Sequence, residues 1–582
     1  MNKFLKISNL TYTYQGEDKP AISNINLEID EGEFVVLMGP SGCGKSTLAL
    51  CINGIIPNVL GGEFEGTVEI DGLDTKEHEV YELSTRVGIV FQNPDSQLCN
   101  LIVKDELSFG PENLLVEKSE ILKSIGEYLN FVALSHKENS NIYELSGGEK
   151  QRVAIASILT MYPKMVILDE PTSNLDPIGA RGIIKVIKEL NKKKNLTVLL
   201  IDHEVSNILY LADRLIILDE GTIMYDGNPR YILEKYGDNI FKNIGVRIPK
   251  ITQLAVRLNK KGFKISPFPL TVKEAVKSIL KEKTIEVKEK EKLYTESRMG
   301  SVEEKAEFVI EKIIDVQGLN FKYPNGTRAV KDVTFSINKG DMVALMGKNG
   351  SGKTTLGSLL IGLNKPDSGK GVIANLDINK SSINELSKKI GYVFQYPEHQ
   401  FITSSCYDEI AFSLKSEKFE ESEKKHRVEK VLELLELTEF TERNPLNLSM
   451  GQKRRLSIAT MLVKDLEVLI LDEPFTGQDG KNISKLMDII QKINNNNLTI
   501  LIITHDLHIA SKYFNKVMLM DNGELVFYGK TFELYDFLEI NKLRYINTPQ
   551  IFRLSKLLKT EGKLDIPIVD DVDEFMKLFE VT

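Results

Sequence analysis

Residues 38–47 read MGPSGCGKST, and residues 346–355 repeat this stretch as MGKNGSGKTT. Both stretches end an apolar run and fit the pattern GxxxxGK[ST], whose glycines allow backbone N–H groups to point at phosphate oxygens. The helix expected after each loop directs the positive end of its dipole to the same point. Two such stretches, each with matched residues downstream, predict two nucleotide phosphate sites rather than two glycine turns. The predicted phosphate-binding residues are Gly39, Pro40, Ser41, Gly42, Cys43, Gly44, Lys45, Ser46 and Thr47 in the first copy, and Gly347, Lys348, Asn349, Gly350, Ser351, Gly352, Lys353, Thr354 and Thr355 in the second.

The repeat extends well beyond these loops. Three further motifs return 303 residues later: VFQNPDSQ (90–97) as VFQYPEHQ (393–400), LSGGEKQR (145–152) as LSMGQKRR (448–455), and LDEP (168–171) as LDEP (471–474). After the last motif, Pro249 and Gly262 return 300 residues later as Pro549 and Gly562. The chain is therefore a duplication, and each copy has its own C-terminal extension.

Apolar runs predict the fold of each copy. EFVVLMG (33–39), MVILD (165–169) and TVLLID (197–202) are typical of buried parallel strands, and the second copy has equivalent runs. The opening stretches FLKISNLTYTY and ISNINLEID favour an added antiparallel sheet, and the residues from about 100 to 145 favour helices. The predicted fold class is α/β: two P-loop NTPase domains that carry antiparallel β and α-helical subdomains. The predicted domains are residues 1–235 and 308–535, with C-terminal extensions at 236–280 and 536–582 and a linker at 281–307.

The extensions and the linker each leave two interpretations open. Thr271 and Glu274 predict a capping box at the start of an amphipathic helix. Its apolar stripe is Val272, Ala275, Val276, Ile279 and Leu280, and the second copy keeps this face with Val572, Met576 and Phe579. Such helices either cap their own domain or pair the two halves. Residues 281–307 alternate Lys and Glu, which favours a solvated, flexible linker over a charged helix.

The composition restricts the class of protein. The chain has 582 residues, a formal net charge of −9 and 42% hydrophobic residues. No apolar run approaches the roughly 18–20 residues of a transmembrane helix, and the N-terminal stretch does not have the pattern of a secretory signal. Four cysteines without paired spacing predict no zinc or iron–sulfur site and fit a reducing compartment. The acidic balance disfavours a general affinity for nucleic acids.

A second set of residues is predicted to surround the phosphates. Asp169 and Glu170 end one apolar strand, and Asp472 and Glu473 end its counterpart, so their carboxylates are expected beside the phosphate loops rather than as plain surface charge. There an aspartate supports Mg²⁺ and a glutamate orients the attacking water. The predicted Mg²⁺ ligands are Ser46, Gln92, Asp169, Thr354, Gln395 and Asp472, and the predicted catalytic residues are Glu170, Glu473, His203, His505, Gln92 and Gln395.

Two tyrosines precede the phosphate loops at nearly equal distances. Tyr14 lies 25 residues before Gly39, and Tyr323 lies 24 residues before Gly347. Either ring is wide enough to stack on the base of a nucleotide, and packing within a sheet is the alternative. Stacking on the base is the favoured prediction.

LSGGE and LSMGQ, read together with the P-loop, glutamine and histidine motifs, resemble the signature of the ATP-binding cassette (ABC) ATPases. The resemblance covers about 30–225 and 325–530 of this chain. It implies ATP and Mg²⁺ as cofactors, hydrolysis of ATP, and two cassettes that pair within the chain so that the signature of one completes the ATP site of the other. The signature residues are Ser146, Gly147, Gly148, Ser449, Met450 and Gly451.

The second copy departs from the family pattern in two places. Met450 stands where the first copy has Gly147, and FTGQD (475–479) stands where the first copy has TSNLD (172–176). In the arrangement that the resemblance implies, both changes belong to the ATP site that contains Glu170. We therefore expect two hydrolytic sites of unequal rate.

A finer resemblance follows each VFQ motif. Asp95 and Gln97 in PDSQ (94–97), and Glu398 and Gln400 in PEHQ (397–400), resemble the coupling segment of energy-coupling factor (ECF) importers of vitamins and metal ions. This implies docking of a transmembrane T component, a substrate-binding S component, and a peripheral position on the cytoplasmic face of the membrane. The transported substrate stays open.

Two other functions compete with this interpretation. A soluble tandem-ABC translation factor acting on ribosomes also joins two cassettes by a charged linker, but the acidic net charge and the Pro-acidic-x-Gln segments disfavour it. The ATPase of a conventional ABC importer or exporter is the third possibility.

Overall fold

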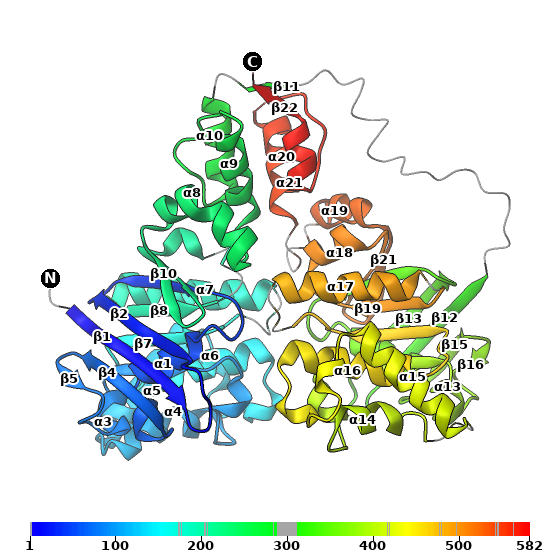
Figure 1. Ribbon diagram of the computed structural model, residues 1–582, viewed down its shortest axis with the longest axis horizontal. Helices are drawn as coiled ribbons and strands as arrows, with labels where there is room; N and C mark the ends of the chain where they lie inside the picture. Colours follow the sequence, from blue (N-terminus) through cyan, green and yellow to red (C-terminus); the bar gives the residue numbers. More distant parts are fainter. Residues whose placement is uncertain are drawn as a thin grey trace. The chain divides into compact units, whose positions relative to one another are not determined.

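The computed structural model describes residues 3–581. Within this range it leaves out residues 173, 174, 176, 203, 204, 207, 283, 284, 288–310, 416, 418, 477, 479, 496, 542, 544, 545, 547 and 563. The chain forms two compact units, Met1–Lys288 together with Gln550–Thr582, and Glu289–Pro549. Each unit contains one cassette, and the last part of the chain returns to the first unit (Figure 1).

Two sheets build the first cassette. An antiparallel sheet has the order β2-β1-β4-β5, and a six-stranded sheet has the order β10-β9-β3-β8-β7-β6, in which only β10 is antiparallel to its neighbour. The strands are β1 Lys3–Tyr14, β2 Ile22–Asp30, β3 Phe34–Met38, β4 Gly62–Ile70, β5 Leu73–Asp74, β6 Val87–Val90, β7 Met165–Asp169, β8 Thr197–Ile201, β9 Arg214–Asp219 and β10 Thr222–Gly227. The helices are α1 Lys45–Ile52, α2 Ile55–Asn58, α3 Val80–Ser84, α4 Val103–Asn113, α5 Lys118–Phe131, α6 Gly147–Leu159, α7 Pro177–Lys194 and α8 Pro229–Asn239.

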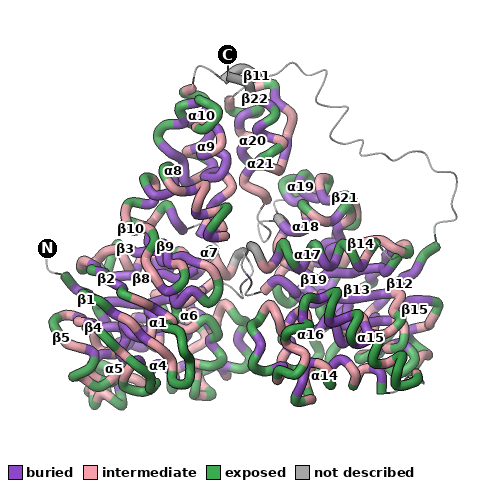
Figure 2. Tube along the Cα trace, viewed as in Figure 1, coloured by how far each residue is buried: buried purple, intermediate pink, exposed green. Residues whose placement is uncertain are grey.

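The central parallel strands β3 and β8 are buried along their whole length. Every residue of β3 and β8 is buried, and in Figure 2 these strands are purple throughout. Such strands have apolar side chains on both faces, because helices or another sheet cover both. Leu37 of β3, Leu48 of α1 and Ile7 of β1 belong to one core, so the antiparallel sheet packs over the phosphate-loop helix. The predicted α/β architecture, with its antiparallel sheet and its helical segment after residue 100, is confirmed.

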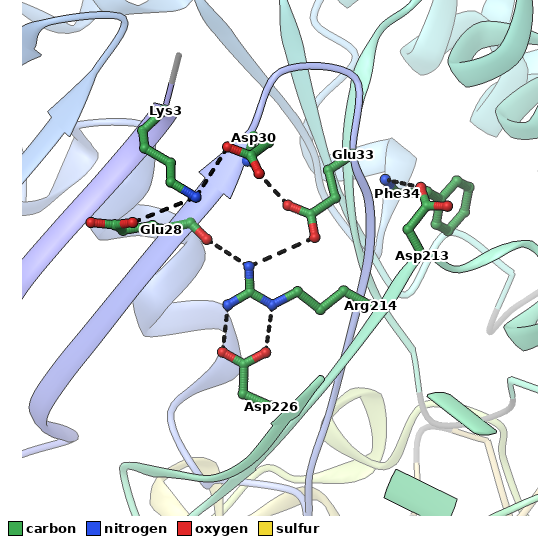
Figure 3. A network of polar contacts seen from close by, with 8 residues as sticks. All are labelled: Lys3, Glu28, Asp30, Glu33, Phe34, Asp213, Arg214 and Asp226. Atoms are coloured by element: carbon green, nitrogen blue, oxygen red, sulfur yellow. Dashed lines mark hydrogen bonds and ion pairs between the residues drawn. The ribbon is translucent and has the colours of Figure 1, made fainter. Parts of the chain in front are cut away.

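A network of charged side chains joins the two sheets of the first cassette (Figure 3). Arg214 of β9 forms a two-pronged ion pair with Asp226, with Nε–Oδ1 and Nη2–Oδ2 distances of 2.5 Å, and donates to the carbonyl oxygen of Glu28 in β2 at 2.7 Å. Lys3 of β1 pairs with Asp30 of β2 at 3.1 Å. A planar guanidinium suits this arrangement because its donors lie in a fixed fork.

The second cassette repeats this plan. Its sheets have the orders β13-β12-β15-β16 and β17-β18-β19-β14-β20-β21. The strands are β12 Lys312–Lys322, β13 Arg328–Asn338, β14 Met342–Gly347, β15 Ser368–Ile373, β16 Leu376–Asp377, β17 Ile390–Val393, β18 Val468–Asp472, β19 Thr499–Ile503, β20 Lys516–Asp521 and β21 Glu524–Lys530. The helices are α12 Lys353–Leu360, α13 Ile383–Leu386, α14 Cys406–Phe412, α15 Glu421–Leu434, α16 Met450–Leu462, α17 Gly480–Asn494, α18 Leu507–Tyr513 and α19 Thr531–Ile540. The predicted boundaries at 235 and 535 fall inside α8 and α19.

The two C-terminal extensions pack against each other within the first unit (Figure 1). The first consists of α9 Lys250–Lys260 and α10 Val272–Lys281, and the second of α20 Gln550–Thr560, α21 Val572–Lys577 and β22 Phe579–Val581. Arg257 forms an ion pair with Asp573, and Lys261 Nζ donates to the carbonyl oxygen of Met576 at 3.1 Å. Phe552 is fully buried. Of the two interpretations of these helices, pairing is therefore confirmed.

The predicted helix start at Thr271 is confirmed in part. The Thr271 hydroxyl accepts from the backbone N–H of Glu274 at 3.3 Å, but Glu274 turns its carboxylate to Arg230 and to the N–H of Leu270. Leu280, expected on the apolar stripe, is 45% exposed.

The predicted linker 281–307 needs a correction at its start. Lys281 still belongs to α10, and strand β11, Ile285–Val287, pairs antiparallel with β22. The partner strand of β11 lies almost 300 residues further along the chain, so a local sequence pattern does not reveal the pairing. Residues 288–307 lie outside the described part of the chain.

Candidate functional site

Each phosphate loop ends at a position whose backbone conformation only glycine adopts without strain. Gly44 precedes α1 and Gly352 precedes α12, both with φ of 100°. A Cβ atom at these positions would lie 2.5 Å from the carbonyl oxygen of Ala21 and 2.1 Å from that of Ala329. Left-handed φ and a close neighbouring backbone both favour glycine here. The loop therefore places the N-terminus of a helix at the carboxyl edge of the sheet.

The loop lysines are buried and turned into their own loops. Lys45 Nζ donates to the carbonyl oxygens of Gly39 at 2.9 Å and Pro40 at 2.7 Å. Lys353 Nζ makes the equivalent bonds to Gly347 and Lys348, each at 2.9 Å. Their ammonium groups thus lie within the curve of the loop, where phosphate oxygens are expected.

The acidic pairs end equivalent strands of the two cassettes, as the sequence predicts. Asp169 is the last residue of β7 and Asp472 is the last residue of β18. Glu170 and Glu473 follow with φ of 47° and 46°, a conformation that is rare for residues other than glycine. Backbone strain at the same position of both copies is typical of functional sites, because the surrounding structure has to impose it.

In the first cassette these carboxylates contact the other predicted ligands. Ser46 Oγ donates to Asp169 Oδ2 at 2.7 Å, and Gln92 Nε2 donates to Glu170 Oε2 at 2.8 Å. The P-loop hydroxyl therefore contacts the strand-end aspartate, and the glutamine contacts the glutamate that follows it. His203 lies outside the described residues.

In the second cassette the equivalent carboxylates contact a tyrosine and a histidine. The Tyr392 hydroxyl donates to Asp472 Oδ2 at 2.8 Å, and His505 Nδ1 lies 2.9 Å from Glu473 Oε2. Burial raises the pKa of the Asp472 carboxyl above its ordinary value, while the Tyr392 hydroxyl acts in the opposite direction. The Glu473 carboxylate raises the pKa of His505 to about 9, so the imidazole is protonated at neutral pH. The Thr354 hydroxyl, from the second residue of α12, also lowers the pKa of Asp472, and the backbone carbonyl oxygen of Gln395 accepts from Arg454 Nη2 at 2.6 Å.

The residues present fit Mg²⁺ at an ATP site. In the first cassette a hydroxyl and a carboxylate oxygen, Ser46 Oγ and Asp169 Oδ2, lie side by side. In the second, the buried Oδ1 of Asp472 has no hydrogen-bond partner among the described residues. The described part of the chain holds no group of three or more His, Cys, Asp or Glu side chains suited to a metal ion. A nucleotide-bound Mg²⁺ needs no such group, because phosphates and water supply most of its oxygens.

Both tyrosines predicted to stack on the base are attached to their own phosphate-loop helix. The hydroxyl of Tyr14 lies 3.1 Å from Thr47 Oγ1, and the hydroxyl of Tyr323 lies 3.0 Å from Thr355 Oγ1. The two rings thus occupy equivalent places beside their loops, and stacking on the base stays a prediction.

The signature residues begin the helices that follow them. Ser146 caps α6 in a capping box with Glu149, and Ser449 caps α16 in a capping box with Gln452. Met450, the third residue of LSMGQ, has 40% of its surface exposed. Each helix start therefore presents backbone N–H groups and the positive end of its dipole, which suits an anionic phosphate.

The predicted coupling segments form one-turn 3-10 helices, η1 Pro94–Ser96 and η7 Pro397–Gln400. Lys150 Nζ donates to Asp95 Oδ1 at 2.6 Å, so this acid already has a basic partner within its own cassette. Gln97 accepts from the backbone N–H of Phe91 at 3.0 Å and donates to the carbonyl oxygen of Ile89 at 3.1 Å. Gln400 donates to the carbonyl oxygen of Tyr392 at 3.4 Å. The two glutamines thus brace the loop, and contact with a membrane partner stays a prediction.

Comparison with known proteins agrees with this geometry. The profile of the family described as ABC transporter matches residues 22–173 and 330–476. A Methanosarcina mazei protein provisionally named ABC transporter ATP-binding protein is 36% identical over 99% of this chain and 98% of its own length. This chain belongs to the ABC transporter ATP-binding family. As an ABC ATPase it binds and hydrolyses ATP.

Two further relatives are informative in different ways. A Bacillus subtilis protein provisionally named HMP/thiamine import ATP-binding protein YkoD is 38% identical over 92% of this ABC chain and 93% of its own. The solved structure of cbiO1 from Clostridium perfringens, described as part of the ABC transporter complex cbiONQ, is 32% identical. It covers 44% of this chain and 97% of its own, with a TM-score of 0.38. Among the described residues, no helix of this ABC ATPase is long and apolar enough to cross a bilayer.

Two residues near the site were not predicted to be functional. Tyr392 and Arg454 stand where the first cassette has Ile89 and Gln151. A difference between otherwise matched repeats, at positions next to the VFQ and signature motifs, is the signal by which they can be found.

Proposed function

We propose that this chain is the ATP-hydrolysing subunit of an ECF-type importer, which drives uptake of a vitamin, a vitamin precursor or a metal ion through separate T and S components. It would bind peripherally at the cytoplasmic face of the membrane. Full-length similarity to a relative whose provisional name concerns HMP/thiamine import supports the vitamin class. Mg²⁺ would be held by the hydroxyl and carboxylate oxygens described above.

The observation that carries the proposal is a pair of exposed apolar side chains repeated in both cassettes. Phe109 of α4 and Phe412 of α14, 303 residues apart, are 52% and 46% exposed. Tyr143 and Leu446, also 303 residues apart, are 74% and 57% exposed. Large apolar residues left exposed at the same place in both copies are typical of a surface that binds a partner.

In the first cassette the exposed Tyr143 adjoins the coupling segment. Lys150 Nζ lies 5.8 Å from the centre of the Tyr143 ring and donates to Asp95 at 2.6 Å. An exposed aromatic ring, a lysine and a carboxylate therefore form one cluster beside η1. An amphipathic helix of a membrane partner would find both apolar and charged contacts here.

Co-purification from detergent-solubilised membranes tests the proposal. The variant Tyr143→Asp/Leu446→Asp is expected to lose an integral membrane partner of the T class, while its ATP binding is retained. Tyr231→Asp/Ile540→Asp is the matched control, because these residues are also exposed, at 55% and 78%, but lie on α8 and α19. Equal retention of the partner by both variants would contradict the docking surface.

Charge reversal tests the coupling segments themselves. Asp95→Lys combined with Glu398→Lys is expected to weaken assembly and to leave nucleotide binding intact. Unchanged assembly would mean that these acids have no docking role. Sedimentation of the native protein with ribosomes, rather than with the membrane fraction, would favour the translation-factor alternative.

A further inference from the structure

Arg454 is a buried cation in the second cassette that no catalytic motif explains. It lies on α16, five residues after Ser449, and only 1% of its surface is exposed. Its Nη1 donates to the carbonyl oxygen of Phe394 at 2.7 Å, and its Nη2 donates to that of Gln395 at 2.6 Å. Both oxygens belong to the backbone of the VFQ motif, so one guanidinium joins the signature helix to the loop that carries Gln395.

The surroundings keep this guanidinium charged. Burial lowers the pKa of Arg454 to about 10, while the acids Glu398, Asp472 and Glu473 favour its protonated form. The group therefore remains a cation at neutral pH. Charge-assisted hydrogen bonds of this length are stronger than neutral ones, particularly where water is excluded.

The first cassette has a much weaker link at the same place. Gln151 stands at the position equivalent to Arg454, and its Nε2 lies 3.5 Å from the carbonyl oxygen of Phe91. Among the described residues the Gln151 side chain donates this one hydrogen bond, whose length is at the upper limit. The two cassettes therefore differ in how firmly the signature helix holds the loop of the catalytic glutamine.

We propose that Arg454 is a positioning residue for ATP hydrolysis, holding the backbone at Phe394 and Gln395 so that the Gln395 side chain is aimed at the site of Asp472 and Glu473. The loop continues directly into the coupling segment, where Glu398 lies close enough to interact with the guanidinium. Movement of that segment would therefore be passed to α16, whose first turn contains the signature. This role concerns ATP hydrolysis alone and does not depend on the identity of the membrane partner.

Steady-state ATPase kinetics of the full chain test the proposal. Arg454→Gln introduces the residue that the first cassette uses and is expected to lower kcat about three- to tenfold while the KM for ATP changes less than about twofold. Arg454→Lys, which keeps the charge but cannot reach both carbonyls as a fork, is expected to recover part of the loss. Arg427→Gln is the matched control, because Arg427 forms its ion pairs with Glu423 and Asp465 on the surface of α15; its kcat should equal that of the native protein.

A double-mutant comparison separates positioning from a merely structural effect. If Arg454 acts through Gln395, Arg454→Gln has no further effect in a Gln395→Ala background. An unchanged kcat in Arg454→Gln, or a loss that multiplies with that of Gln395→Ala, would overturn the proposal. If Arg454→Gln does not fold, Arg454→Lys carries the same comparison, with a loss of about twofold or more that disappears in the Gln395→Ala background.

Discussion

Tyr392 and Asp472 are joined by a buried hydrogen bond of 2.8 Å. The phenol of Tyr392, in β17, donates to the carboxylate of Asp472 at the end of the neighbouring strand β18. The first cassette has Ile89 in place of the tyrosine, whereas both aspartates have a phosphate-loop hydroxyl beside them, Ser46 for Asp169 and Thr354 for Asp472. The two ATP sites of this ABC ATPase therefore differ at the aspartate predicted to bind Mg²⁺. A hydroxyl beside this carboxylate stabilises the ionised form that a metal requires.

Removing the Tyr392 hydroxyl is expected to impair Mg²⁺ use. In Tyr392→Phe the pKa of Asp472 rises further above its ordinary value, because burial then acts without the opposing hydrogen bond. The acid limb of the pH profile of kcat/KM should move to higher pH, and the Mg²⁺ concentration for half-maximal activity should rise about three- to tenfold. Tyr528→Phe serves as the control, since that hydroxyl donates to the carbonyl oxygen of Ser336. Identical profiles for native and Tyr392→Phe protein would show that the bond has no role in metal binding.

The His505–Glu473 pair predicts a pH-dependent contribution to stability. Because folding raises the pKa of His505 from 6.5 to about 9, the contribution is fully present below pH 6.5 and is lost as the pH rises through 9. His505→Gln should therefore lower the melting temperature by about 2–4 °C near pH 6 and have no effect near pH 10. His426→Gln, at an exposed position on α15, controls for loss of an imidazole. A His505→Gln effect that is the same at both pH values would contradict the assignment.

The two strand-end glutamates are expected to contribute unequally to turnover. The departures at Met450 and in the segment 475–479 belong, in the family pattern, to the site of Glu170, so Glu473→Gln should lower kcat more than Glu170→Gln, by about threefold or more. ATPase assays of the two single variants under the same conditions measure this difference. Equal losses would refute the predicted asymmetry.

The packing of the two extensions predicts which residues protect strand β11. Phe552→Ala removes a fully buried ring from α20 and should destabilise the paired extensions by about 3–5 kcal/mol. Backbone amides of residues 285–287, which lie in the strand pair with β22, should then exchange with solvent much faster. Phe532→Ala, on α19 of the other unit, should leave their exchange unchanged. Unaltered protection at 285–287 in Phe552→Ala would mean that β11 is held by something other than this packing.

Most of the site follows from local sequence. A phosphate loop, such as the one ending at Gly44 and Lys45, is formed by consecutive residues whose backbone conformation depends on their own side chains, and strands with continuous apolar runs are recognised without knowledge of their partners. The same holds for Asp169 and Asp472, because a carboxylate that ends a parallel strand lies at the carboxyl edge of the sheet. The duplication strengthened each of these predictions by presenting it twice.

Relations between distant residues were decided only by the tertiary structure. Tyr392 meets Asp472 across 80 residues, Arg454 reaches the carbonyl oxygen of Gln395 across 59, and β11 pairs with β22 near the other end of the chain. No periodic pattern or motif in the sequence predicts these contacts. Each depends on which groups the packing of strands and helices brings within hydrogen-bond distance. The sequence by itself therefore predicted the residues of both ATP sites, whereas the folded chain decided which neighbouring side chains support each of them.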